Sequence, residues 1–170
     1  KNSRDIFIKN AFEKLNRYSN IDRKSLDCNN IAITGSAGKT SVKDLTGFCL
    51  NKLDKTYYSK SSFNNKYGVP LSIINSPQST KFSVLEVGMD KKGEIDTLTK
   101  LIRPNLGLIT NISYAHIKNF RNLDEIAKAK GEIINNIFPS GVMIINKDDK
   151  YCNYFLSKAK MRNLNFITFS

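Results

Sequence analysis

The sequence lacks an apolar run long enough to cross a membrane. A membrane-spanning helix needs about 20 consecutive apolar residues, and no stretch of the 170 residues approaches that length. The apolar stretch at residues 6–8 is also too short for the core of a signal peptide. These absences exclude an integral helical membrane protein and give no sign of secretion. The chain starts with Lys1 rather than Met, so an excised fragment is one interpretation of the sequence.

Cysteine is also scarce. Cys28, Cys49 and Cys152 lie far apart and form no C-x-x-C pair, which excludes the usual zinc motifs and a disulfide framework. Reduced thiols are the simplest account, so we expect a cytoplasmic protein. Cys49 falls on the apolar face of a predicted helix, where we expect a small buried side chain.

Acidic residues are few: 15 Asp and Glu stand against 27 Lys and Arg, for a formal net charge of +12. A basic surface attracts anions such as nucleotides or nucleic acid. The lysines are scattered, however, and no aromatic signature of an RNA-binding module accompanies them. We therefore interpret most of this charge as a solvated surface and do not expect nucleic acid as a partner.

The pattern of apolar residues predicts an α/β fold. Segments typical of buried strands alternate with segments of helical period through the whole chain, which favours a mostly parallel sheet with helices on both faces. We divide the chain into an N-terminal helix and linker, residues 1–30, and one domain, residues 31–170. The helix is predicted over residues 5–18, and the polar residues 20–30 are predicted as linker.

The most informative stretch is Thr34-Gly35-Ser36-Ala37-Gly38-Lys39-Thr40-Ser41, which follows an apolar strand and opens a helix. This order of strand, glycine turn and helix is typical of a phosphate-binding P-loop, here in the shortened form G-x-x-G-K-T. An ordinary strand-to-helix turn is the alternative. Gly35 and Gly38 permit positive φ values and close backbone approach.

The residue types in this loop suit nucleotide binding. We expect the amides of residues 36–40 to converge on phosphate oxygens. Lys39 would add a positive charge at the β- and γ-phosphates, and the Thr40 hydroxyl would bind Mg²⁺. Two further polar residues, Glu86 and Asn111, end predicted strands. Ligands of such folds bind beyond the carboxyl ends of strands, so we expect both residues near the P-loop.

Several other residues have two interpretations each. Glu86 suits a metal-holding carboxylate opposite Thr40, or it is a solvated carboxylate at a strand end. His116, the single histidine, is a fair metal ligand or a structural residue.

Lys130 lies near the apolar stripe of a helix predicted over residues 123–138. Periodicity alone favours a Lys130 side chain that extends to water over a buried one with a lowered pKa. Asn64 and Asn65 bind a substrate or form a turn.

Five segments, taken in order, resemble the central ATP-binding domain of the Mur ligases, which build the peptide of peptidoglycan precursors. The resemblance runs from about Ala11 to the end of the chain. The segments are Ile33-Thr34-Gly35-Ser36-Ala37-Gly38-Lys39-Thr40-Ser41-Val42-Lys43, Phe63-Asn64-Asn65 with Gly68-Val69-Pro70-Leu71, Glu86-Val87-Gly88-Met89 with Gly93-Glu94-Ile95, Thr110-Asn111-Ile112 with Ala115-His116, and Ala127-Lys128-Ala129-Lys130-Gly131-Glu132-Ile133. The combination is most similar to the branch of the family that adds D-alanyl-D-alanine.

The resemblance implies an ATP-dependent ligase with two Mg²⁺ sites. ATP phosphorylates the terminal carboxylate of a UDP-N-acetylmuramoyl-tripeptide, and the amine of D-alanyl-D-alanine attacks the acyl phosphate. Thr40 and Glu86 would hold the first Mg²⁺, and His116 would help to bind the second. Lys130 matches a lysine that the family carries as a carbamate, an anionic ligand for the second metal.

The resemblance also implies roles for the remaining residues. Lys39 and the loop amides would stabilise charge on the transferring phosphoryl group. Asn64 or Asn65 would contact the substrate or phosphate near the acyl group.

The chain also departs from the family. Members carry a uridine-nucleotide-binding domain before this region and a further domain after it. We expect the central domain here to be incomplete at its C-terminal end, and the isolated chain to bind nucleotide weakly. A ligase of the folylpolyglutamate synthase type and a non-catalytic basic module that binds nucleic acid or a partner remain alternatives. The sequence leaves open the third residue of the acceptor peptide, carbamylation of Lys130 and the oligomeric state.

Overall fold

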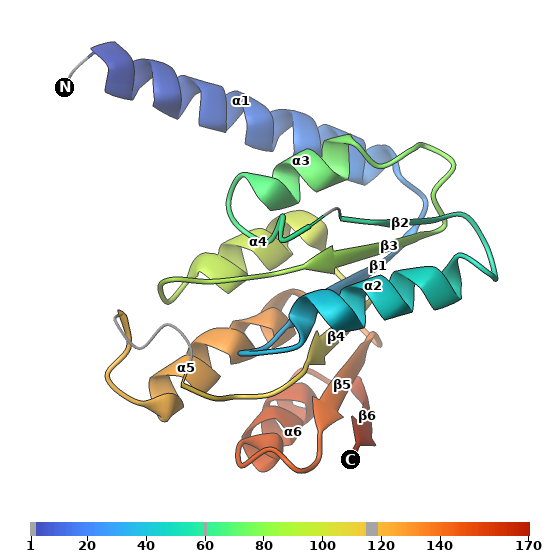
Figure 1. Cartoon of the computed structure of the whole chain (residues 1–170), viewed down its shortest axis with the longest axis vertical. Helices are drawn as coiled ribbons and strands as arrows, with labels where there is room; N and C mark the ends of the chain where they lie inside the picture. The colour runs from blue at the N-terminus through green and yellow to red at the C-terminus, as the bar shows by residue number, and fades with distance from the viewer. Residues whose placement is uncertain (1–2, 60, 115–118) are drawn as a thin grey trace.

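The computed structural model describes residues 3–59, 61–114 and 119–170, with side chains from residue 9 onward (Figure 1). The strands are β1 (Asn29–Thr34), β2 (Thr56–Tyr58), β3 (Phe82–Glu86), β4 (Leu106–Ile109), β5 (Val142–Asn146) and β6 (Asn165–Phe169). The helices are α1 (Ser3–Ser25), α2 (Lys39–Leu50), α3 (Gly68–Ile74), α4 (Glu94–Ile102), α5 (Leu123–Lys130), α6 (Cys152–Met161) and the 3₁₀-helix η2 (Gly131–Asn136).

The strands form one parallel sheet in the order β2-β3-β1-β4-β5-β6. β1 is central and buried from residue 30 to its end, as is typical of a parallel strand covered on both faces. One face packs under α2 through a small core that includes Ile31, Ile33 and Val84. A larger core lies on the other face, under α3, α4, α5, η2 and α6. The predicted α/β fold with helices on both faces is confirmed.

The chain reverses its direction of travel across the sheet at β1. From β1 it passes to β2 and β3 on one side, and then returns across β1 to β4 on the other side. Ile33 is therefore in register with Glu86 on β3, and Thr34 with Ile109 on β4. The loops that follow β1, β3 and β4 emerge side by side, which is where open parallel sheets bind ligands.

The N-terminal helix is longer than predicted. α1 continues to Ser25, so residues 20–25 are helix and not linker. The buried side chains of its second half include Ser19 and Arg23, and α1 packs against α3 and α4 (Figure 1). The Nε of Arg23 donates to the carbonyl of Ile102 at 2.7 Å. Because this buried face is largely polar, apolar periodicity could not reveal it.

The fully buried positions of α2 are not its apolar ones, although Val42 and Leu50 pack partly buried against the small core. Its buried positions are Lys43 and Gly47, because Gly47 lies so close to Tyr58 that a Cβ would be 2.4 Å from the ring. The opposite face is exposed, and with it Cys49 and Leu45. The prediction of a buried Cys49 is wrong.

The helix predicted over residues 123–138 is two elements. α5 ends at Lys130 and continues as the 3₁₀-helix η2. Gly131 marks the change, and a Cβ there would lie 3.2 Å from the ring of Phe155. In the described part of the chain, no helix combines the length and the apolar character that a membrane span requires.

We predict that Arg23→Leu lowers the free energy of unfolding by about 1–3 kcal/mol, because the carbonyl of Ile102 loses a buried charged donor. Chemical denaturation measures the change. Arg17→Leu, at an exposed position of the same helix, is the matched control and should change stability by less than about 0.5 kcal/mol. Equal effects of the two substitutions would mean that α1 is not anchored through Arg23.

Candidate functional site

The glycine turn after β1 lies directly against the end of β4. Gly35 has a φ of 151° and Gly38 a φ of 76°, both in the region that favours glycine. A Cβ on Gly35 would lie 1.8 Å from the Oγ1 of Thr110, so no side chain fits there. The Thr110 hydroxyl in turn donates to the carbonyl of Ala37 at 2.6 Å. The loop is therefore fixed by contacts with β4 as well as by its own sequence.

Asn111 holds two of the loop amides. The amide of Ser36 donates to the Asn111 carbonyl at 2.9 Å, and the amide of Ala37 donates to the Asn111 Oδ1 at 3.0 Å. The expectation that every amide of residues 36–40 points to phosphate is therefore wrong for these two. They are engaged because the loop is tied to the neighbouring strand.

The rest of the loop forms the start of α2. Gly38 is the N-cap and has no side chain with which to cap the helix, and the first turn holds no acidic residue. Ser41 lies exposed in the same turn. An uncapped helix N-terminus offers amide donors and a positive dipole end to an anion. The amides of Gly38, Lys39 and Thr40 are thus the ones placed for a phosphate.

Glu86 lies beside this helix end, as predicted. Its Oε2 accepts from the Thr40 hydroxyl at 2.8 Å, and its Oε1 accepts from the side-chain Nδ2 of Asn64 at 2.7 Å. The Glu86 side chain is buried, with 1% of its surface exposed, so the interpretation as a solvated carboxylate is wrong. Three segments that are distant in the sequence therefore meet at one carboxylate.

The structure also distinguishes the two neighbouring asparagines. Asn64 reaches Glu86, whereas the Oδ1 of Asn65 accepts from the amides of Tyr67 and Gly68, both at 3.0 Å. Asn65 therefore forms the turn that starts α3. Both residues line the cavity described below, but of the two only Asn64 donates to Glu86.

Lys39 and Lys130 converge on one atom. The Nζ of each donates to the carbonyl oxygen of Gly35 at 2.9 Å. Lys130 is 1% exposed, so the prediction that it extends to water is wrong: its helix faces the P-loop at this position. Burial, and then the charge of Lys39, lowers the pKa of Lys130 to about 7. His116 lies outside the described residues.

Sequence reasoning missed two residues that shape this site. In the sequence Asn111 is only a polar residue at a strand end, and its link to the loop amides depends on how β1 and β4 pair. Glu132 lies in one of the motifs, and the motif gives no contact for it. Its carboxylate accepts from the amide of Gly93 at 2.8 Å and from that of Asp96 at 3.2 Å. Glu132 therefore caps α4, and no sequence pattern pairs it with residues so far away.

A cavity of about 830 Å³ opens beside Lys39 and Lys130. Its other lining residues come from α1, the loop before α3, and residues 88–94 and 97–98. Five lysines and two acidic residues line it: Lys39, Lys66, Lys91, Lys92, Lys130, Asp90 and Glu94. The cavity is thus predominantly basic and adjoins the P-loop.

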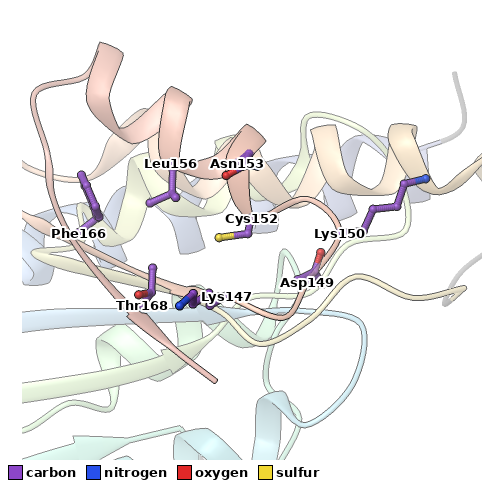
Figure 2. A pocket seen from close by; sticks show the side chains of 8 residues that line it. All are labelled: Lys147, Asp149, Lys150, Cys152, Asn153, Leu156, Phe166 and Thr168. Atoms are coloured by element: carbon purple, nitrogen blue, oxygen red, sulfur yellow. The ribbon is translucent and has the colours of Figure 1, made fainter.

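A second cavity, of about 440 Å³, lies between α6 and β6. Figure 2 shows Cys152, Leu156 and Phe166 around it, with Lys150 directed away from the other labelled side chains. None of the predicted site residues that the structure describes lines it. The larger cavity is therefore the one that belongs to the candidate site.

A family model for the Mur ligase middle domain matches residues 33–170. The chain belongs to the Mur ligase family. Its Mur ligase relatives include the UDP-N-acetylmuramoyl-tripeptide--D-alanyl-D-alanine ligase of Rickettsia prowazekii, which is 36% identical over 155 residues. These residues cover 91% of this chain and 34% of that relative. The chain spans about a third of the length of the curated relatives it matches.

Solved Mur ligase structures share the fold. A crystal structure of MurF from Acinetobacter baumannii gives a TM-score of 0.89 at 31% identity, over 94% of this chain and 35% of that one. MurF from Thermotoga maritima in complex with ADP gives 0.82 at 25% identity, over 93% and 36%. The chain thus has the fold of part of a MurF ligase.

A folylpolyglutamate-type enzyme is less similar. The bifunctional folylpolyglutamate synthase/dihydrofolate synthase of Yersinia pestis is 13% identical, with a TM-score of 0.66 over 92% of this chain and 48% of that one. This likeness shows the fold alone.

We predict that the stability contributed at Lys130 depends on pH. The pKa of Lys130 is about 7 in the folded chain against an ordinary value of 10.5. Between these values the unfolded chain binds a proton that the folded chain does not, so stability rises as the pH rises from about 7 towards 10.5. Between pH 7 and about pH 9.5, the free energy of unfolding of the unaltered chain should rise by about 2–3 kcal/mol relative to that of Lys130→Met.

Denaturant unfolding in degassed buffer measures this gain, because degassing removes the carbon dioxide that a carbamate requires. Lys128→Met, at an exposed position of the same helix, is the control and should show no such pH-dependent difference. The lowered pKa would be contradicted if the difference in free energy of unfolding between the unaltered chain and Lys130→Met stayed constant with pH.

Proposed function

We propose that this chain is the ATP-binding part of a ligase that joins D-alanyl-D-alanine to a UDP-N-acetylmuramoyl-tripeptide. The observation that carries the proposal is the contact of Thr40 with Glu86 at 2.8 Å, beside the uncapped end of α2. A hydroxyl and a carboxylate for a divalent cation thereby adjoin an anion-binding helix end. The substrates come from the names of the similar ligases. Since the chain spans about a third of those relatives, the activity is proposed for the whole protein.

The donor set of this site fits Mg²⁺. Among the described residues no three His, Cys, Asp or Glu side chains gather as a metal cluster. Mg²⁺ does not need such a cluster, because it is usually bound by one or two carboxylates plus substrate phosphates and water. Glu86 and Thr40 would hold the ion, which neutralises charge on the phosphates. His116 and a carbamylated Lys130 would serve a second ion.

Lys39 binds the phosphates of ATP in this proposal. Its ammonium donates to the carbonyl of Gly35 at 2.9 Å, and it reaches the β- and γ-phosphates by leaving this acceptor. Together with the amides of residues 38–40, it stabilises the charge on the phosphoryl group during transfer to the tripeptide carboxylate. The carbonyl of Gly35 keeps its hydrogen bond from Lys130.

Two features support a carbamate on Lys130. The amine is buried, and a pKa of about 7 leaves a large neutral fraction near pH 7. Only the neutral amine has the free electron pair that attacks carbon dioxide, and the nitrogen then loses one proton to solvent to leave the anionic carbamate. The charge of Lys39 then changes from a repulsive neighbour to an attractive one.

The basic cavity receives the acyl substrate. Its five lysines against two acidic residues attract a substrate that carries phosphates and carboxylates. An oxygen of the terminal carboxylate attacks the γ-phosphorus of ATP, the bond from this phosphorus to the β,γ-bridging oxygen breaks, and an acyl phosphate and ADP result. The amine of D-alanyl-D-alanine then forms the C–N bond and loses a proton, while the C–O bond to phosphate breaks. A cytoplasmic location completes the proposal, since the three cysteines are free and the reaction consumes ATP.

We predict that Lys39→Ala weakens Mg²⁺-dependent ATP binding about tenfold to a hundredfold, because charged hydrogen bonds to phosphate are lost. Isothermal titration calorimetry with and without Mg²⁺ measures the affinity. Lys52→Ala, just after α2 and exposed, is the control and should bind as the unaltered protein does.

Unchanged binding in Lys39→Ala would contradict the proposal. A basic nucleic-acid-binding module would instead bind RNA with an affinity that falls steeply with salt and does not depend on Lys39.

We predict different effects for substitutions of the two neighbouring asparagines, one on Mg²⁺ dependence and one on stability. Asn64→Ala removes the donor to Glu86 and should raise the Mg²⁺ concentration for half-maximal nucleotide binding about tenfold. Asn65→Ala removes the acceptor for two amides at the start of α3. It should cost about 1 kcal/mol of stability and leave the Mg²⁺ dependence unchanged. Thermal unfolding and Mg²⁺ titrations separate the two, and a reversed pattern would refute the assignment of Asn64.

A further inference from the structure

Lys43 is a fully buried lysine that the proposed mechanism does not use. None of its side chain is exposed, and it lies on α2 one turn after Thr40. Its Nζ donates to the carbonyl of Ser59 at 2.5 Å and to that of Ser61 at 3.0 Å. Both carbonyls belong to the segment that leads from β2 to Asn64. The ammonium group of Lys43, on the helix that follows the P-loop, therefore binds the backbone of the loop whose Asn64 contacts Glu86.

We infer that Lys43 is a positioning residue that fixes the backbone at Ser59 and Ser61, so that Asn64 holds Glu86 in the orientation that faces Thr40. The inference rests on the proposed function, because the orientation of Glu86 matters for a Mg²⁺ site. Within the described residues, the Lys43 ammonium bonds to Ser59, Ser61 and Asp44 rather than to Glu86, and Lys43 does not line the cavity. Its effect passes through the backbone to Asn64.

The loop is held at both ends of this path. At its start, Lys43 bridges two carbonyls that are two residues apart. At its end, the carbonyl of Asn64 accepts from the amide of Gly88 at 2.7 Å. A Cβ on Gly88 would lie 3.0 Å from the Asn64 side chain, so the approach is close. The Asn64 side chain is therefore placed by the attachments of its own backbone.

Lys43 contacts Ser59 and Ser61 through the charge of its ammonium group and not merely by filling space. An apolar side chain could fill the same space without the cost of burying a charge, and hydrogen bonds to the two carbonyls compensate for that cost. The ion pair of Lys43 with Asp44, at 3.2 Å, involves a carboxylate that is 55% exposed, and such pairs contribute little. The Ser59 hydroxyl is buried without a hydrogen-bond partner within the described residues. Attachment of the loop at Ser59 thus depends on its backbone.

The test is a double-mutant cycle of Lys43→Met with Asn64→Ala in the protein that contains this chain. The readout is the Mg²⁺ concentration for half-maximal binding of a fluorescent ATP analogue. We expect Lys43→Met to raise it roughly tenfold, as loss of a partner behind a metal ligand does. The double variant should be no worse than Asn64→Ala alone, because both changes act through one contact. Lys55→Met, exposed before β2, is the control and should be unchanged.

Two results would overturn the inference. One is a Lys43→Met variant with the Mg²⁺ dependence of the unaltered protein. The other is a double variant whose Mg²⁺ concentration for half-maximal binding is about a hundredfold above that of the unaltered protein, since additive effects indicate independent roles. If thermal unfolding shows that Lys43→Met does not fold, Lys43→Gln takes its place in the same cycle. Its shorter amide cannot bridge both carbonyls, so unchanged Mg²⁺ dependence in Lys43→Gln would also overturn the inference.

Hydrogen exchange separates this inference from the proposed function. The amide of Asn64 donates to the carbonyl of Ser62 at 2.8 Å, and Lys43→Met should speed its exchange without any nucleotide present. If the unaltered protein shows no Mg²⁺-dependent nucleotide binding but exchange accelerates, the proposed function fails and the positioning of the loop by Lys43 stands. Unchanged exchange would overturn the positioning itself.

Discussion

The candidate site depends on the close approach of Gly35 to the end of β4. A Cβ at Gly35 would lie 1.8 Å from the Thr110 hydroxyl, so only a glycine lets the turn lie against that strand. The carbonyl of Gly35 can then accept from Lys39 and Lys130 together, and Asn111 can bind two of the loop amides. A turn displaced from β4 would lose these contacts at the same time.

Features encoded over short stretches could be predicted from the sequence. The apolar run into Gly35 and the Gly-Lys-Thr that follows set the strand, turn and helix, because each depends on neighbouring residues. The alternation of strands and helices then predicted a parallel sheet. That topology brings Glu86 to the P-loop, since Glu86 ends β3 and the P-loop follows β1, the neighbouring strand.

The environment of single polar side chains could not be predicted in the same way. Periodicity counts a lysine as exposed, yet Lys43 and Lys130 are among the most deeply buried side chains, because carbonyl acceptors come from segments distant in the sequence. The same limit hid the polar buried face around Arg23 and the exposure of Cys49. Asn64 and Asn65 are adjacent and chemically identical, so only the path of the backbone assigns one to the carboxylate and the other to a turn.

The engagement of Ser36 and Ala37 by Asn111 has a consequence for the thermodynamics of ligand capture. A flexible glycine-rich loop loses conformational entropy when it closes on an anion. Here that loss occurs when the chain folds, since the strand next to the loop already fixes its shape. Association then requires little rearrangement of the backbone, and more of the gross interaction energy is retained as affinity.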